Sequence, residues 1–208
     1  MRIKQWRKDS KMFQIVSDIF INFLSMIFMF NATDGNAIDY DNSLYMELEK
    51  GRVVIELRPD LAPQHVARIK ELVRMHFYDN VPFHRVIDGF MAQTGDPTGT
   101  GMGGSGKNIK AEFNNAPHVR GTVSMARASD PDSADSQFFI VLADSPFLDG
   151  QYTVFGKVIS GMQFVDGIKK GDPNKNGTVS KPDRIKYMEV ASDVMNTKPE
   201  ERDAAPKK

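Results

Sequence analysis

The chain has 208 residues with 27 basic and 27 acidic side chains, and it contains no cysteine. This length favours one domain with a substantial hydrophobic core, and the balanced charge gives no general attraction to nucleic acid or to an anionic membrane. The lack of cysteine excludes disulfides, thiolate metal sites and cysteine nucleophiles.

The first 37 residues have the order of a secretory signal peptide. A basic segment over residues 1–11 precedes a nearly continuous apolar run over residues 19–30, and small polar residues follow up to Ala37. A signal peptide has this order, with an apolar run of roughly 7–15 residues. We therefore predict cleavage after Ala37 and a periplasmic or secreted mature protein.

Two alternatives for this N-terminal segment stay open. Residues 12–30 could form an uncleaved membrane anchor, although a span needs about 20 apolar residues and Asp18 would be costly at membrane depth. An amphipathic or disordered extension of a cytoplasmic protein is the other alternative. The membrane is a partner only if the leader is retained.

The segment after the leader begins with a predicted hairpin and a helix. Two alternating runs flank Lys50-Gly51, which is typical of a β-hairpin. Its inward residues are expected to be Leu44, Met46, Leu48, Val53, Ile55 and Leu57. Asp60 is expected to cap a helix that begins near Pro63. The buried stripe of this helix is predicted to be Val66, Ile69, Leu72 and Val73.

Short strand candidates dominate the rest of the chain. They cover residues 81–87, 90–93, 121–127, 137–143, 152–159 and 183–191, and a second helix fits residues 161–170. Many short strands with two helices predict a mainly β fold, a closed antiparallel barrel with helices over its openings. We expect one domain over residues 38–194 and a flexible charged tail over residues 195–208.

Two polar loops resemble ligand sites. Gly101 and Gly106-Lys107 nearly match a phosphate-binding loop, but Asn108 stands where Ser or Thr would hold magnesium. A surface loop is therefore the better interpretation, and a nucleotide-dependent enzyme is a weak hypothesis.

The second loop has the ligand spacing of a calcium site, with Asp172, Asn174, Asn176, Gly177 and Asp183. Pro173 and Pro182 interrupt it, and its last ligand is Asp where a bidentate Glu is expected, so a polar turn is favoured. The four histidines form no ligand pair, and we predict no metal and no cofactor.

The stretch VPFHRVIDGFMAQTGD sets Arg85 among apolar residues with no nucleophile beside it. A salt-bridged arginine beside ordinary core aromatics is the plainer interpretation. A second stretch over residues 136–156 has a similar character, with Gln137 followed by Phe138 and Phe139.

Together these stretches resemble the cyclophilin-type peptidyl-prolyl cis-trans isomerases. The matching segments are FHRVIDGFMAQTGD, GTGMGGSG, AEF, GTVSMARA, DSQFFIVL and FLDGQYTVFGKVISGM, which run in family order between Leu44 and about Val194. The resemblance implies an eight-stranded antiparallel barrel with a helix at each end. It also implies isomerisation of X-Pro bonds in proline-containing peptides and unfolded proteins, in aid of protein folding, and we expect a monomer. A proline-peptide binding module or chaperone is the alternative.

The resemblance also implies the site residues. Arg85 would be catalytic, and the substrate-binding residues would be Phe90, Met91, Gln93, Met125, Ala126, Arg127, Gln137, Phe139, Phe147, Leu148 and Tyr152. Phe147 stands where many members have tryptophan, Tyr152 replaces a histidine and Arg127 replaces an asparagine. We therefore expect isomerase activity together with weak cyclosporin binding. The neighbour His84 is expected to point to the other side of the strand.

Overall fold

The computed structural model describes residues 38–196. The predicted signal peptide or anchor over residues 1–37, and the part of the predicted tail from residue 197 onward, lie outside the described residues. Between residues 38 and 196, no helix combines the length and the apolar character that crossing a membrane requires.

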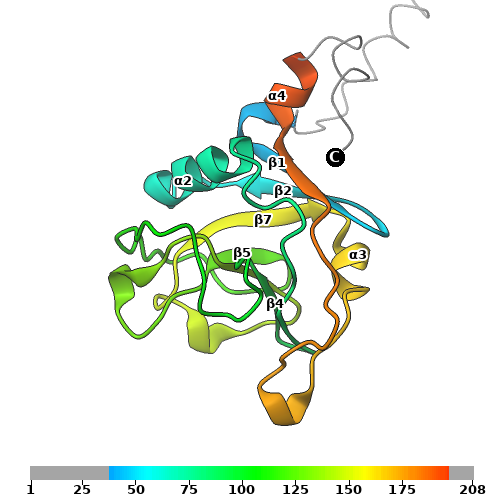
Figure 1. Cartoon of the computed structure of the whole chain (residues 1–208). Helices are drawn as coiled ribbons and strands as arrows, with labels where there is room; N and C mark the ends of the chain where they lie inside the picture. The colour runs from blue at the N-terminus through cyan, green and yellow to red at the C-terminus, as the bar shows by residue number, and fades with distance from the viewer. Residues whose placement is uncertain (1–37, 197–208) are drawn as a thin grey trace, which may run out of the picture. The chain divides into compact units, whose positions relative to one another are not determined.

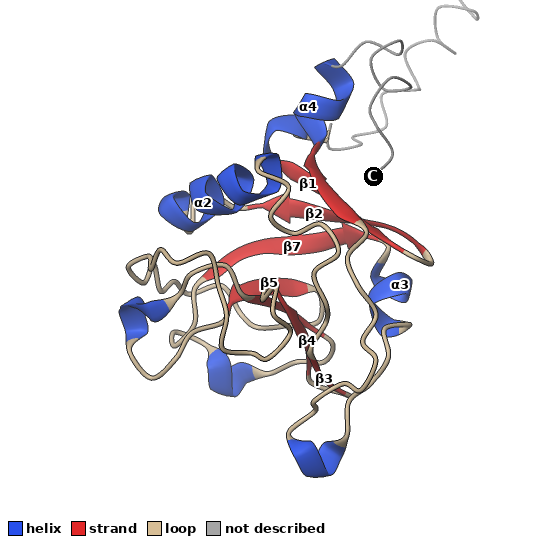
Figure 2. Cartoon of the chain, viewed as in Figure 1, coloured by secondary structure: helices blue, strands red, loops and turns tan. Residues whose placement is uncertain are grey.

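One antiparallel sheet of eight strands forms the body of the described chain, as predicted. The strands are β1 (Ser43–Leu48), β2 (Gly51–Leu57), β3 (Arg85–Ile87), β4 (Met91–Thr94), β5 (Thr122–Met125), β6 (Phe138–Val141), β7 (Val154–Ser160) and β8 (Tyr187–Val190). Their order in the sheet is β3-β4-β6-β5-β7-β2-β1-β8. Figure 2 shows that long loops with short helical turns surround β3, β4 and β5.

The prediction of a closed barrel overstated the pairing, because the sheet is a curled half-barrel with β3 and β8 as its edges. Between these two edges, the irregular segment before β8 forms hydrogen bonds with the segment before β3. The amide of Phe83 donates to Asp183 O at 2.9 Å, and the amide of Ile185 donates to Val81 O at 2.9 Å. Pro182 has no amide hydrogen and Lys181 has a φ of 55°, so this segment cannot continue as a regular strand.

The hairpin prediction is confirmed by the pairing of β1 with β2. Leu44 lies opposite Ile55 and Met46 lies opposite Val53, so the apolar residues of both strands face the same side. All six residues predicted to point inward are buried.

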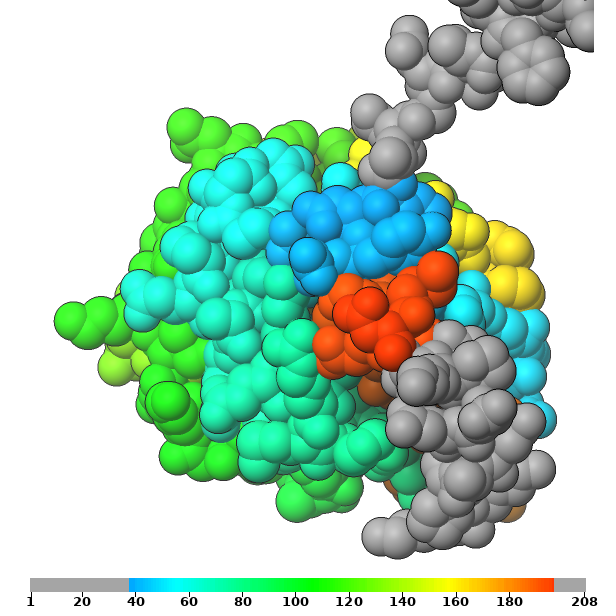
Figure 3. Space-filling model, turned by 90° about the horizontal axis from the view of Figure 1, so that it is seen from above, coloured from blue at the N-terminus to red at the C-terminus, as the bar shows by residue number. Residues whose placement is uncertain are grey.

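Residues 38–196 contain three α-helices where two were predicted. They are α2 (Pro63–Arg74), α3 (Met162–Asp166) and α4 (Ala191–Asn196). The predicted stripe of α2 is buried, and α3 is shorter than expected because it ends at Gly167. Figure 1 shows α2 and α3 at opposite sides of the molecule. Figure 3 shows α4 beside the start of the described chain on the face that α2 also covers.

The predicted cap of α2 was wrong. Asp60 pairs with Arg58 at 2.6 Å instead, and Ala62 at the N-cap position provides no side-chain hydrogen bond. The carboxylate of Glu112 accepts from the amides of Gln64 and His65 at 3.1 and 3.0 Å. The first amides of a helix need acceptors from elsewhere, and here a carboxylate 47 residues away supplies one.

Candidate active site

Strand register brings the main polar and apolar site residues together. Arg85 on β3 lies opposite Gln93 on β4, and Gln93 lies opposite Phe139 on β6. Because side chains alternate along a strand, Met91 shares the face of Gln93. Three adjacent strands therefore present a cation, an amide and an aromatic ring on one surface.

These residues line a pocket of about 110 Å³, which we call the apolar pocket because six of its nine lining residues are apolar or aromatic. Its lining consists of Arg85, Phe90, Met91, Gln93, Ala126, Arg127, Phe139, Leu148 and Tyr152. All nine belong to the set expected from the sequence. A small recess with mostly apolar walls and the guanidinium groups of Arg85 and Arg127 at its edge suits an apolar ring attached to a polar backbone.

The guanidinium of Arg85 is held by neutral acceptors. Nη1 donates to Gln93 Oε1 at 3.1 Å, Nη2 donates to Asn176 Oδ1 at 3.0 Å, and Nε donates to Asn176 O at 3.0 Å. Within residues 38–196, no carboxylate forms a salt bridge with Arg85. Burial lowers the pKa of Arg85 from its ordinary value, but an arginine stays charged in proteins.

The floor of the pocket is a supported aromatic ring. Phe139 is 5% exposed, and the Tyr152 ring meets it edge-on at 5.8 Å between centroids. Behind it, the His118 ring stacks at 6.1 Å with an interplanar angle of 18°. His118 is itself fixed, with Nδ1 2.9 Å from an Asp149 oxygen and Nε2 3.0 Å from Ser124 Oγ. The ring that would meet a substrate is therefore held from two sides.

Arg127 forms the neighbouring wall. Its guanidinium lies 4.8 Å from the centroid of the Tyr152 ring and donates to Gln151 O at 3.0 Å. A guanidinium over an aromatic face is attractive by about 0.5–1 kcal/mol at an exposed site. Arg127 and Tyr152, which both depart from the common family pattern, thus form a stacked pair at the edge of the pocket.

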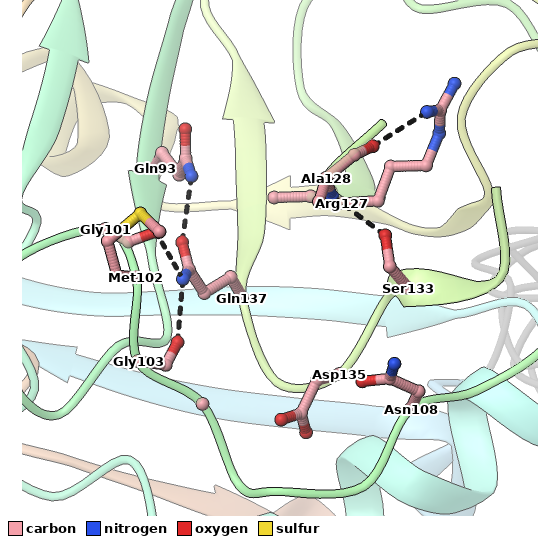
Figure 4. Close-up of a pocket in the computed structure, with 12 residues that line it drawn as sticks. Gln93, Gly101, Met102, Gly103, Asn108, Arg127, Ala128, Ser133, Asp135 and Gln137 are labelled. Atoms are coloured by element: carbon pink, nitrogen blue, oxygen red, sulfur yellow. Dashed lines mark hydrogen bonds between the residues drawn. The ribbon is translucent and has the colours of Figure 1, made fainter. Parts of the chain in front are cut away.

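A second pocket of about 320 Å³, which we call the polar pocket because six of its twelve lining residues have polar side chains, adjoins the first, and the two share Gln93, Ala126 and Arg127. Figure 4 shows Gln137 between Gln93 and the backbone of the loop that resembles a phosphate-binding sequence. Gln137 Nε2 donates to Gly101 O at 3.0 Å and to Gly103 O at 2.8 Å, while its Oε1 accepts from Gln93 Nε2 at 2.9 Å. A chain of amide hydrogen bonds therefore runs from this loop to Arg85.

The loop is anchored by Asp96, which is fully buried. Its carboxylate accepts from the amides of Thr98, Gly101 and Gly103 at 2.8, 2.6 and 3.1 Å. Burial alone would raise the pKa of Asp96, but hydrogen bonds from Thr98, Gly103 and Gly101 outweigh burial and lower this pKa to about 2. The loop is thus a fixed wall of the polar pocket.

Three of the expected site residues lie outside the apolar pocket. Gln137 lines the polar pocket. Phe147 is 62% exposed beside Phe90, with 5.4 Å between their ring centroids. The side chain of Met125 lies in the core at 1% exposure, away from both pockets. His84 is buried, as expected, and burial lowers its pKa.

Three residues that support the site were not predicted from the sequence, namely Asp96, His118 and Asn176. The Asp-Pro-Thr-Gly-Thr-Gly sequence that begins at Asp96 could have indicated a carboxylate that turns back onto its own loop. No local sequence signal indicates the contacts of His118 with Asp149 and of Asn176 with Arg85, since these partners are 31 and 91 residues away in the chain. Within residues 38–196, no group of three or more His, Asp or Glu side chains is arranged to hold a metal.

The fold and the pocket together suit binding of an apolar ring of a peptide beside the guanidinium of Arg85, which forms no salt bridge within residues 38–196. Residues 43–190 match the family model described as cyclophilin type peptidyl-prolyl cis-trans isomerase/CLD. A probable peptidyl-prolyl cis-trans isomerase of Brucella suis biovar 1 is 52% identical over 171 residues, which cover 76% of this chain and 87% of the relative. Peptidyl-prolyl cis-trans isomerase B of Bacillus subtilis is 47% identical over 134 residues, 63% of this chain and 93% of the relative.

Solved structures with a similar fold belong to the same class of protein as these relatives. Cyclophilin AquaCyp293 from Hirschia baltica has a TM-score of 0.67 at 29% identity and covers 78% of this chain and 77% of its own. A Cryptosporidium parvum cyclophilin type isomerase, solved in the presence of the dipeptide Ala-Pro, has a TM-score of 0.66 at 32% identity and covers 71% of this chain and 98% of its own. The chain belongs to the cyclophilin-type peptidyl-prolyl cis-trans isomerase family, and the resemblance noted in its sequence is confirmed.

Proposed function

We propose that Arg85 is the catalytic residue of this isomerase and that the apolar pocket holds the proline ring of an X-Pro substrate. The X-Pro bond turns over a barrier of roughly 18–20 kcal/mol because its C–N bond is partly double. No covalent bond forms or breaks, so the reaction needs no nucleophile and no acid–base pair. In the twisted transition state the proline nitrogen regains its lone pair and becomes an acceptor.

A charged donor aimed at that nitrogen binds the transition state better than the planar ground state, which is the condition for catalysis. The observation that carries the proposal is Arg85 itself, a cation at the edge of an apolar pocket with only neutral acceptors around it. An ion pair would offset its charge, whereas neutral acceptors orient the guanidinium and leave its field available to a substrate.

Arg85 cannot supply the whole effect. A turnover on the order of 1000 per second corresponds to a barrier of about 13 kcal/mol, so about 5–7 kcal/mol must be removed. One charge-assisted hydrogen bond contributes about 1.5–3 kcal/mol. We assign the remainder to the pocket, in which Phe139, Met91 and Leu148 would hold the ring away from water while Gln93 binds the peptide backbone.

The proposed substrates are proline-containing segments of unfolded proteins, and the proposed role is assistance in their folding. The relative solved with Ala-Pro supports a proline peptide as ligand. We further propose that the clients are exported proteins, on the strength of the signal-peptide pattern in residues 1–37. Weak cyclosporin binding and a monomeric state are also proposals, the first because Phe147 replaces tryptophan.

A peptide isomerisation assay tests the proposed role of Arg85. The wild-type protein should accelerate cis-to-trans conversion of an X-Pro tetrapeptide, and Arg85→Ala should reduce kcat/KM by on the order of a hundredfold. Arg58→Ala is the matched control, because Arg58 pairs with Asp60 outside both pockets. If Arg85→Ala binds peptide as well as the wild type but has lost turnover, catalysis is separated from simple proline binding. Wild-type turnover in folded Arg85→Ala would refute the role.

A further inference from the structure

The loop that resembles a calcium site in sequence contacts Arg85 in the structure. Asn176 accepts from Arg85 twice, through its backbone oxygen from Nε at 3.0 Å and through Oδ1 from Nη2 at 3.0 Å. Arg85 and Asn176 are 91 residues apart in the chain. The loop bearing Asn176 is therefore part of the surroundings of the proposed catalytic group.

The backbone of the loop places both acceptors of Asn176 on the same side. Asn176 ends the short helical turn η4 (Pro173–Lys175) with φ 52° and ψ 36°, a left-handed conformation that asparagine adopts more readily than most residues. Gly177 follows with φ 75°, and its carbonyl accepts from the amide of Val86 at 2.8 Å. The loop is thus tied to β3 next to the arginine that it contacts.

Counting the donors of the guanidinium shows what this contact does. Of the five N–H groups of an arginine, two point at Asn176 and one at Gln93. Met91 Sδ lies 3.9 Å from Nη1, a weak contact at most. The guanidinium is fixed at both of its ends by neutral oxygens, and the remaining hydrogens on Nη1 and Nη2 stay available to a substrate.

We propose that Asn176 is a positioning residue that fixes the orientation of the Arg85 guanidinium without neutralising its charge. The inference rests on the proposed catalytic role of Arg85. It gives the polar loop over residues 172–178 a role in the isomerase site. An aspartate at position 176 would keep the oxygen but would pair with Arg85, so the uncharged amide is the feature that matters.

Two substitutions at position 176 distinguish the need for an acceptor oxygen from the need for an uncharged side chain. Asn176→Gly removes the side-chain acceptor and tolerates the left-handed backbone, and Asn176→Asp keeps an acceptor and adds a charge. We expect Asn176→Gly to lower kcat about tenfold, the effect of one lost hydrogen bond to a charged group, with KM changed less than about twofold because the apolar pocket is intact. Asn176→Asp should lower kcat at least as much. Asn174→Ala, an exposed residue of the same loop, should match the wild type.

A double-mutant cycle distinguishes positioning from a general effect of the loop. If Asn176 acts through Arg85, Asn176→Gly should cause no further loss in an Arg85→Ala background assayed at proportionally higher enzyme concentration. An equal loss in both backgrounds would overturn the inference, as would wild-type kcat in folded Asn176→Gly while Arg85→Ala is impaired. That second outcome leaves the proposed function standing. Wild-type turnover in Arg85→Ala alone would instead refute the proposed function, and the inference with it.

Discussion

Replacement of Asp96 by asparagine should weaken both the fold and the site, although Asp96 lines neither pocket. The Oδ2 atom of Asp96 accepts from the amides of Gly101 and Gly103 at 2.6 and 3.1 Å. In Asp96→Asn, with Oδ1 still accepting from Thr98, an NH₂ group would face these two amide donors. Both amides would lose this acceptor, and they would face the NH₂ group of a fully buried side chain.

The expected loss of stability follows from these contacts. Leaving a buried donor unsatisfied costs about 1–3 kcal/mol, so two such donors could cost about 2–6 kcal/mol. Because these contacts are only partly buried and the loop can relax, we expect a loss of about 2–4 kcal/mol. Activity should fall several-fold as well, because the carbonyls of Gly101 and Gly103 hold Gln137, which in turn holds Gln93. Misplacement of positioning groups by fractions of an ångström slows catalysis.

The same residue gives a pH dependence with a definite sign. The pKa of Asp96 is about 2 in the folded protein, below its ordinary value of 3.8. The ionised carboxylate therefore stabilises the fold above about pH 4, and this contribution, about 2 kcal/mol at most, is lost as the pH falls from 4 toward 2.

Urea unfolding at pH 7 and at pH 3 measures the loss of stability and its pH dependence. The proteins compared are the wild type, Asp96→Asn and the exposed control Asp79→Asn. The stability difference between the wild type and Asp96→Asn should shrink at pH 3, and kcat/KM at pH 7 should be lower only in Asp96→Asn. Equal stability of all three proteins at pH 7, together with unchanged turnover, would refute the anchoring role of Asp96.

Three further predictions concern the pocket floor, its rim and the leader. Phe139→Ala should raise KM and lower turnover on a proline peptide, with loss of up to about 3–5 kcal/mol of stability as its buried ring is removed; an unchanged kcat/KM would show that proline binds elsewhere. Phe147→Trp should bind cyclosporin more tightly than the wild type, since tryptophan adds contact area and an N–H donor; equal titration curves would contradict this. Trp6 is the only tryptophan in the chain, so cleavage after Ala37 should leave tyrosine emission alone and an N-terminus near Ile38. Recovery of full-length, tryptophan-containing protein from cells with working export would count against the signal peptide.

Local patterns predicted the hairpin, the buried stripe of α2 and the approximate positions of most strands. These features depend on alternation, on helical periodicity and on turn residues, all of which are present in a short window of sequence. Arg85 lies opposite Gln93 because the three residues 88–90 connect β3 to β4 and pair Ile87 with Met91. A two-residue turn at Asp88-Gly89 would instead have placed Arg85 opposite Ala92. The other residues of the pocket were predicted from the resemblance to the isomerase family, which extends over most of the chain.

Long-range contacts account for what the sequence did not predict. Glu112 caps α2 from 47 residues away, and Asn176 contacts Arg85 from 91 residues away. Local capping rules pointed to Asp60 because they consider only neighbours. The curled sheet likewise stops short of closure because proline and positive-φ residues interrupt the segment before β8, and a pattern of strand-like runs does not show which of them pair.

We propose that Arg85, at the edge of the apolar pocket, accelerates rotation about the X-Pro bond. NMR exchange spectroscopy measures that rotation directly, with a proline tetrapeptide in excess over the protein and no protease present. Exchange between the cis and trans resonances should occur within seconds in the presence of the wild-type protein. With the same concentration of folded Arg85→Ala it should slow toward the uncatalysed rate, which is tens to hundreds of seconds at 25 °C. Equal exchange rates with both proteins would contradict the claim.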